Sequence, residues 1–245
     1  MLDLSHLNDL APTGTLRGGV VVAPAKSMSF ATRADDAAVQ GVPVDLLHGF
    51  AAVLNVPLAL TEFSNSGQLT DAIAEARCDI GFMPRDAARE ARVAFGPSFY
   101  LMGSTYLVPA GSEIFTIEAV NREGIRIVAI ANTTTARAAR RTAPLAIVEE
   151  VGSVDIMTAM AQRGEADAFA LSHDSFIGLL PKIPGARVLP GQFQQTGIGV
   201  AVPPGRPGAL ILARQLIEEA KASGLVRRAF DAAGFVDAAV APLEI

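Results

Sequence analysis

Hydrophobic and polar positions in the first part of the chain follow two alternating patterns. Short runs of β-branched and other apolar residues indicate buried strands, and apolar residues repeating every three to four positions indicate amphipathic helices. Asn55, directly after one such repeat, is typical of a helix end. Strands alternating with helices favour a parallel sheet, so an α/β unit is expected here. The pattern predicts strands at residues 16–22, 56–61 and 78–83 and helices at residues 44–54 and 68–75.

The same pattern returns further along the chain. It predicts strands at residues 125–130, 146–148 and 168–171, with a helix at residues 133–141. Two further segments, residues 104–109 and 197–203, are extended, rich in β-branched residues and closed by proline, and we interpret them as paired crossovers between two units. Residues 207–235 carry a helical apolar stripe typical of core packing.

Composition narrows the possible functions. The chain has 245 residues, of which 50% are hydrophobic, and its mean hydropathy is +0.35, so it can bury a large core. A net charge of -5 without a run of like charges argues against nucleic-acid or anionic-membrane partners. Tryptophan is absent, which further disfavours a base-stacking surface. The sequence has no apolar run long enough to span a membrane.

Cysteine and histidine usage predicts neither a metal site nor a cofactor. Cys78 is the single cysteine, so an internal disulfide is excluded and a buried, inert thiol is expected. The three histidines, His6, His48 and His173, lie far apart in sequence and have no metal-ligand spacing. We therefore expect no cofactor and no metal.

The N-terminal segment gives an expectation for the cellular compartment of the protein. Residues 1–16 contain acidic residues and no Lys or Arg, unlike the basic start of a secretory signal. As written, the chain is expected to be cytoplasmic, and removal of a leader would instead make it periplasmic.

Hydroxyl-bearing residues mark one candidate binding segment. Asn132, Thr133, Thr134 and Thr135 lie between a predicted strand and the following helix. Backbone N–H groups and hydroxyls at a helix start can hold a carboxylate or phosphate, although capping the helix needs only one of these hydroxyls. Both interpretations stay open at this point.

Several motifs in order resemble the family-3 bacterial extracellular solute-binding proteins, which have a type II periplasmic-binding fold. The resemblance covers almost the whole chain. It is closest to members without an obvious signal peptide that start near "L-A-P-T-G-x-L-R". The motifs are residues 10–17 (LAPTGTLR), 41–46 (GVPVDL), 79–82 (DIGF) followed by Arg89, 93–100 (VAFGPSFY) and 185–191 (GARVLPG).

The resemblance implies a fold and a mode of action. It implies an α/β, two-lobed type II periplasmic-binding-protein-like fold joined by two hinge strands, with residues 1–106 and 200–245 as lobe I and residues 107–199 as lobe II. A small polar solute, an amino acid or another small carboxylate, would bind in the cleft between the lobes as they close. An ABC permease is the implied protein partner, and a monomer or weak dimer is expected.

The resemblance also implies specific ligand contacts. Arg89 would pair with a ligand carboxylate through two parallel hydrogen bonds, whereas without the resemblance it is one of several solvated arginines with Arg85 and Arg92. The threonines at 133–135 match a ligand loop in which glycine is usual at the position of Asn132.

Two departures from the family pattern affect ligand identity. Ser172 stands where an aspartate usually holds the ligand ammonium group, so Asp174 either replaces that aspartate or caps a helix entered at Ser175. In the first lobe Phe82, Met83 and Pro84 replace the family's serine-rich stretch before the arginine, which predicts a more apolar pocket. The loop at residues 25–30 is expected to contribute Phe30 by stacking, or as plain core, and Ser27 or Ser29 by hydrogen bonding.

Two alternative functions remain. Cyclohexadienyl or arogenate dehydratases resemble this fold, and Asp174, His173 or Glu62 would be their acid here. The sequence shows no nucleophile, base and orienting group together, so we predict a binding protein that is not an enzyme. The other alternative is a cytoplasmic ligand-sensing module without a transporter.

Overall fold

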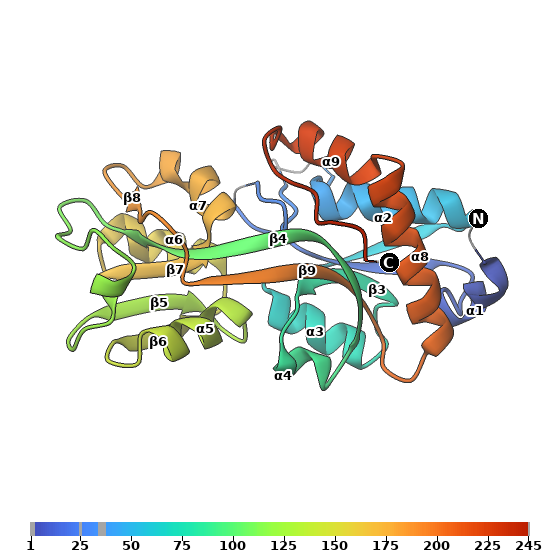
Figure 1. Cartoon of the computed structure of the whole chain (residues 1–245), viewed down its shortest axis with the longest axis horizontal. Coiled ribbons are helices and arrows are strands. Elements are labelled where there is room, and N and C mark those ends of the chain that lie inside the picture. The colour runs from blue at the N-terminus through green and yellow to red at the C-terminus, as the bar shows by residue number, and fades with distance from the viewer. Residues whose placement is uncertain (1–2, 25, 34–37, 245) are drawn as a thin grey trace. The chain divides into compact units, whose positions relative to one another are not determined.

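The chain folds into two compact units (Figure 1). The computed structural model describes residues 3–24, 26–33 and 38–244. Unit 1 comprises the described residues of Met1–Val22, Ser27–Leu101 and Gly197–Ile245, and unit 2 comprises those of Ala23–Lys26 and Met102–Thr196.

The strands of the described residues belong to one hydrogen-bonded sheet, and unit 1 contains its part with strand order β2-β1-β3-β9-β4. β1 pairs in parallel with β2 and β3, whereas β9 runs antiparallel to β3. The elements are η1 (Leu4–His6), α1 (Leu7–Leu10), β1 (Leu16–Val21), α2 (Val42–Leu54), β2 (Leu58–Phe63), α3 (Ser66–Ala74), β3 (Ile80–Pro84), α4 (Ala87–Glu90), the first part of β4 (Ala94–Val108), the last part of β9 (Gln194–Val202), α8 (Pro207–Ala222) and α9 (Leu225–Ala233).

Unit 2 repeats this design with strand order β4-β7-β5-β6. β5 pairs in parallel with β6 and β7, and β4 runs antiparallel to both β7 and β8. Besides parts of β4 and β9, the elements are η2 (Glu118–Val120), β5 (Arg126–Ile130), α5 (Thr134–Thr142), β6 (Ile147–Val151), α6 (Val154–Arg163), β7 (Ala168–Ser172), α7 (His173–Leu179), η3 (Leu180–Lys182) and β8 (Arg187–Val188).

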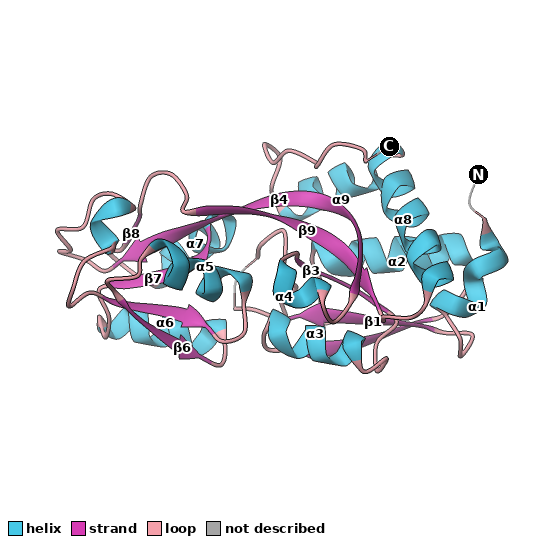
Figure 2. Cartoon of the chain, turned by 60° about the horizontal axis from the view of Figure 1, so that its bottom comes forward, coloured by secondary structure: helices cyan, strands magenta, loops and turns pink. Residues whose placement is uncertain are grey.

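The long strands β4 and β9 connect the two units, as the paired crossovers predicted. They are hydrogen-bonded neighbours, and Figure 2 shows them running side by side. β4 begins at Ala94, ten residues before the predicted segment, because the strand continues through the apolar sequence at residues 94–103.

Residues in the left-handed backbone conformation lie at helix boundaries of unit 1. Asn55 ends α2 in the left-handed conformation, with φ of 54°, as expected for a helix-terminating asparagine. Residues 207–235 are largely helical, as predicted, and Gly224, with φ of 77°, divides them into α8 and α9. Glycine adopts this backbone conformation without a Cβ penalty, so the chain turns there.

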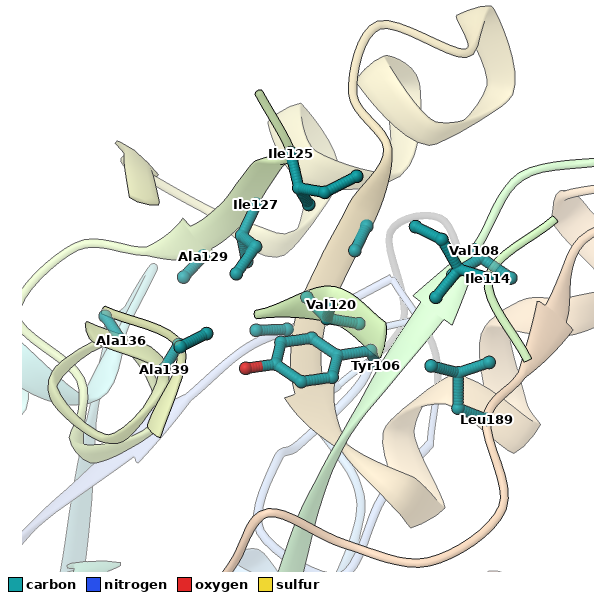
Figure 3. Packing of buried hydrophobic residues seen from close by; sticks show 13 residues of the cluster. Tyr106, Val108, Ile114, Val120, Ile125, Ile127, Ala129, Ala136, Ala139 and Leu189 are labelled. Atoms are coloured by element: carbon teal, nitrogen blue, oxygen red, sulfur yellow. The ribbon is translucent and has the colours of Figure 1, made fainter. Parts of the chain in front are cut away.

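Each unit has its own apolar core. In unit 1 the side chain of Phe82 packs against Phe50 and Phe99 with ring centroids 5.8 and 5.3 Å apart, while Met83, the next residue of β3, lies in a cluster with Leu69 and Cys78. Successive residues of a strand point to opposite faces, so β3 serves both layers of this core. In unit 2, Figure 3 shows Tyr106 among aliphatic side chains from β5, α5 and the loops.

Cys78 lies in the unit 1 core, as predicted. The residue is only 1% exposed, and this burial raises the pKa of the Cys78 thiol. A thiol that is buried and protonated is a poor nucleophile, so Cys78 acts as a small apolar core residue.

A fully buried carboxylate joins three segments of unit 1. Asp79 accepts hydrogen bonds from Arg17 Nε at 2.8 Å, from the Arg17 backbone N–H at 3.1 Å and from Arg206 Nη1 at 3.2 Å. Hydrogen bonding to Asp79 raises the pKa of the Arg17 guanidinium. This carboxylate therefore ties the start of β1 and the residue before α8 to the start of β3.

Candidate functional site

Arg89 is buried inside unit 1 and differs in this from the neighbouring arginines. Its residue exposure is 3%, whereas the side chains of Arg85 and Arg92 are 45% and 48% exposed and form surface ion pairs. Arg89 Nη1 donates to the carbonyl of Pro84 at 2.8 Å, and Nη2 donates to Ser66 Oγ at 2.7 Å. The solvated-arginine interpretation is therefore wrong for this residue.

Local capping holds the Arg89 backbone in place. The side chain of Asp86 caps the one-turn helix α4 by accepting from the backbone N–H of Arg89, with an Oδ1 to N distance of 3.0 Å. Such a cap satisfies a backbone donor that the first helical turn leaves without a partner. The chain thus turns sharply after β3 and directs the Arg89 side chain back toward Pro84.

Ser66 is a polar residue of this region that the sequence analysis missed. The predicted helix began at Gln68, which left Asn65 and Ser66 in a loop. In the structure Asn65 caps α3 by accepting from the Gln68 N–H at 2.9 Å, and Ser66 is the first residue of the helix. The available signal was the Asn-Ser pair just before an apolar repeat, which is typical of a helix N-terminus.

The loop that precedes α2 contributes Ser27 and Phe30 to unit 1. Ser27 is 1% exposed, and its Oγ accepts from the backbone N–H groups of Ser29 at 3.1 Å and Phe30 at 2.9 Å. Ser29 is also buried, and the half-buried ring of Phe30 packs against the core cluster that contains Met83. Residue 25 of the predicted loop segment lies outside the described residues.

Met83 is placed in the core of unit 1. Its exposure is 1%, and its sulfur lies 3.2 Å from the hydroxyl oxygen of Thr70. The same hydroxyl lies 2.7 Å from the carbonyl oxygen of Ser66. Met83 therefore packs behind the first turn of α3, and a direct ligand contact stays a prediction.

In unit 2 the three threonines form the start of α5 and have different partners. Thr133 caps the helix, since its Oγ1 accepts from the Ala136 N–H at 3.1 Å and donates to the carbonyl of Ile130 at 2.8 Å. The Oγ1 of Thr135 lies 3.1 Å from Ser104 Oγ on β4. Thr134 is 2% exposed, and its hydroxyl has no hydrogen-bond partner among the described residues.

Asn132 explains how this loop forms without the glycine usual in the resembled family. Its φ is 59°, in the left-handed region where glycine is favoured and asparagine is the best tolerated alternative. The loop geometry is thus kept although the residue differs.

Ser172 and Asp174 lie at the junction of β7 and α7. Ser172 caps α7, with its Oγ 3.4 Å from the Ser175 backbone N and 2.6 Å from the Ser175 hydroxyl. The prediction that Asp174 caps a helix entered at Ser175 is wrong, because α7 already begins at His173. Asp174 lies in the first turn and is 6% exposed.

The register of the unit 2 sheet brings these hydroxyls into one region. Ser104 and Ser172 are directly paired residues of β4 and β7, so their side chains share a face of the sheet. Ser104 in turn contacts Thr135. The structure therefore gathers Thr135, Ser172 and Ser175 with Ser104, a residue that the sequence analysis did not single out.

The candidate acids of the dehydratase alternative are spread over both units. Glu62 on β2 pairs with Arg33, and both side chains are partly exposed. His173 is exposed, whereas Asp174 is buried in unit 2. Within the described part of the chain no group of three or more His, Cys, Asp or Glu residues could hold a metal ion.

Polar helix starts follow parallel strands in both units. α3 follows β2, and α5 follows β5. In α/β sheets ligands bind outside the carboxyl ends of the parallel strands, where helix N-termini offer backbone donors. Two such units connected by a pair of long strands define the class of type II periplasmic-binding-protein-like folds.

Comparison with known families identifies the chain more closely. Residues 20–232 match the model of the bacterial extracellular solute-binding proteins, family 3. This match covers most of the chain, so the protein belongs to that family of solute-binding proteins. A search of curated proteins found no match.

Solved structures share the fold at low sequence identity. The P235GK mutant of ArgBP from T. maritima has a TM-score of 0.80 at 19% identity, covering 93% of this chain and 98% of that one. An ancestral arginine-binding protein bound to arginine has a TM-score of 0.80 at 18% identity, with 89% and 97% covered. The ancestral amino acid-binding protein AncCDT-1, a precursor of cyclohexadienyl dehydratase, has a TM-score of 0.79 at 20% identity, with 93% and 99% covered.

No helix within the described residues combines the length and the apolar character needed to cross a membrane.

Proposed function

We propose that the protein binds a small carboxylate-bearing solute, an amino acid or a related acid, and delivers it to an ABC permease. Membership of the solute-binding family supports binding of a small ligand. The similar solved structures include arginine-binding and other amino acid-binding proteins, which supports the choice of ligand class.

The observation that carries the proposal is the Thr134 hydroxyl. It is buried at the N-terminus of α5, and it forms no hydrogen bond with any described residue. A buried hydroxyl without a partner costs about 1–3 kcal/mol, so its retention calls for an explanation. A ligand carboxylate is a suitable partner, because the helix dipole and the first backbone N–H groups also favour negative charge there.

Arg89 supports the same ligand chemistry from unit 1. A guanidinium offers several N–H donors in one plane and suits a carboxylate, which accepts two parallel hydrogen bonds. Because the arginine side chain is buried and held by Ser66 and Pro84, little conformational entropy would be lost on binding. We propose Arg89 and Thr134 as ligand contacts and β4 and β9 as the strands that flex when a ligand binds.

A thermal-shift screen tests the proposal directly. L-Arginine, L-glutamine, other amino acids, dicarboxylates and aromatic acids are each added to the purified protein. A ligand present at about a thousand times its Kd stabilises the folded state by about 4 kcal/mol, which raises the melting temperature by several degrees. If no compound with a carboxylate shifts the melting temperature, the proposed ligand class is wrong.

Arg89→Ala tests the first contact. The variant is expected to unfold at a lower temperature without ligand, because Ser66 and Pro84 lose a charged donor. The quantity to compare is therefore the difference in melting temperature with and without the screening hit, which should fall to near zero. Arg92→Ala is the matched control, because Arg92 lies three residues further on and pairs with Asp71 at the surface. An undiminished ligand shift in Arg89→Ala would remove Arg89 from the site.

A further inference from the structure

We propose that Ser66 is a positioning residue that fixes the orientation of the Arg89 guanidinium. This inference builds on the proposed function, in which Arg89 contacts the ligand, and it concerns a residue outside the proposed ligand contacts. The observation behind it is the pair of hydrogen bonds by which two different elements hold one guanidinium.

Two anchors define the plane of the guanidinium group. Nη1 donates to the carbonyl of Pro84, the last residue of β3, and Nη2 donates to Ser66 Oγ, on the first residue of α3. The two acceptors lie on different elements, so each restrains a different nitrogen of the planar group. With both nitrogens held, the plane of the guanidinium has a fixed orientation, and bidentate recognition of a carboxylate needs such an orientation.

The Ser66 anchor is itself rigid. The residue is 5% exposed, and its carbonyl accepts from the Thr70 hydroxyl with an O–O distance of 2.7 Å. Asn65 caps the helix at the preceding position. These contacts fix the backbone of Ser66, so the serine hydroxyl extends toward Arg89 from a fixed position in the chain.

Serine chemistry suits this role better than a carboxylate would. An aspartate at position 66 would form an ion pair with Arg89 and compete with an anionic ligand for the same positive charge. A hydroxyl accepts one N–H and leaves the charge of the guanidinium unneutralised by that contact. Ser66 therefore orients Arg89 without reducing the attraction of Arg89 for a carboxylate.

Side-chain NMR of the guanidinium tests this positioning without a ligand. In the ¹⁵N-labelled full chain, Arg89 is expected to give resolved, slowly exchanging Nη–H signals, which are assigned by their loss in Arg89→Lys. Ser66→Ala should speed exchange of the Arg89 Nη protons roughly ten-fold or more, because a hydrogen bond to a charged group is lost. Ser66→Thr, which keeps the hydroxyl, should restore slow exchange.

A control separates positioning from general destabilisation. Thr158→Ala removes a buried hydroxyl from α6 in unit 2, where it donates to the carbonyl of Val154. This variant should leave the Arg89 signals unchanged even if it lowers the melting temperature. Unchanged Arg89 exchange in Ser66→Ala, or equal acceleration in Thr158→Ala, would overturn the positioning role.

Calorimetry with L-arginine and L-glutamine then connects positioning to binding. If either binds the parent protein, Ser66→Ala should weaken its Kd by roughly ten-fold or more, and Ser66→Thr should recover most of the loss. If neither binds, the amino acid-binding proposal is contradicted for these ligands, while the NMR result still decides whether Ser66 orients Arg89. Altered exchange with an unchanged Kd would show that the orientation of Arg89 has no role in binding.

Discussion

Thr134 and Thr135 are adjacent residues of one helix turn, yet the structure gives their hydroxyls opposite energetic roles. Both are almost fully buried, at 2% and 4% exposure. The Thr135 hydroxyl lies within hydrogen-bond distance of Ser104, whereas the Thr134 hydroxyl has no partner in the described part of the chain. Substituting valine, which has nearly the same shape, removes each hydroxyl without creating a large cavity.

This contrast gives a paired prediction. Thr134→Val should keep or raise the free energy of unfolding, by up to about 1 kcal/mol, because a buried unsatisfied hydroxyl is removed. Thr135→Val should lower it by about 1 kcal/mol, because Ser104 loses its partner. Urea unfolding monitored by circular dichroism measures the free energy of unfolding of both variants. The same Thr134→Val protein should show a smaller thermal shift with the screening hit, and an unchanged shift would argue against a ligand contact at Thr134.

The partner of Ser172 across the sheet could not be predicted from the sequence. The family resemblance singled out Ser172 just after a predicted strand, and in the structure this residue ends β7 and caps α7. The direct pairing of Ser172 with Ser104 depends on the register of β4 against β7. Register is decided by packing across the sheet, so the residue pattern at 168–175 alone does not contain it.

At the scale of elements, Asp79 joins β1, β3 and the start of α8 through Arg17 and Arg206. Asp79→Ala should lower the free energy of unfolding by about 3–5 kcal/mol, because it leaves two partly buried guanidinium groups without their shared carboxylate. Urea unfolding with fluorescent-dye or circular-dichroism detection measures the loss.

Asp71→Ala is the matched control for Asp79→Ala. The Asp71 carboxylate pairs with Arg92 at the surface, and both side chains are about half exposed, at 47% and 48%. Exposed ion pairs contribute about 0–1 kcal/mol, so this variant should change stability little. Similar losses in the two variants would show that burial of Asp79 has no special role.

The order and type of elements could largely be predicted from periodicity, and their ends less well. α2 ends at the predicted Asn55, but α3 begins at Ser66 instead of Gln68, and the stretch at 207–235 breaks at Gly224. The helix α6 was not predicted, although Ser153 and Gly164 cap its two ends. Helix ends depend on single capping residues, whose signal is weaker than that of a repeated apolar stripe.

At the scale of the whole molecule, the proposed closure makes a prediction about size in solution. Small-angle X-ray scattering should show a lower radius of gyration when the screening hit is added at saturation, because a ligand that contacts Arg89 and Thr134, as we propose, would favour a closed state. The Arg89→Ala protein should show no decrease with the same compound. A thermal shift without any change in the radius of gyration would contradict the proposed closure, whereas the proposal that the protein binds this ligand would stand.

The sequence by itself determined the alternation of strands and helices, the two-unit organisation and the family, because these follow from local periodicity and from short motifs that are each continuous in the chain. The tertiary structure decided which polar side chains meet. Ser66 and Arg89 are 23 residues apart, and Ser104 and Thr135 are 31 apart, yet each pair is hydrogen-bonded. Such contacts depend on strand order and register, which arise from packing of the whole unit and are not encoded in any short segment.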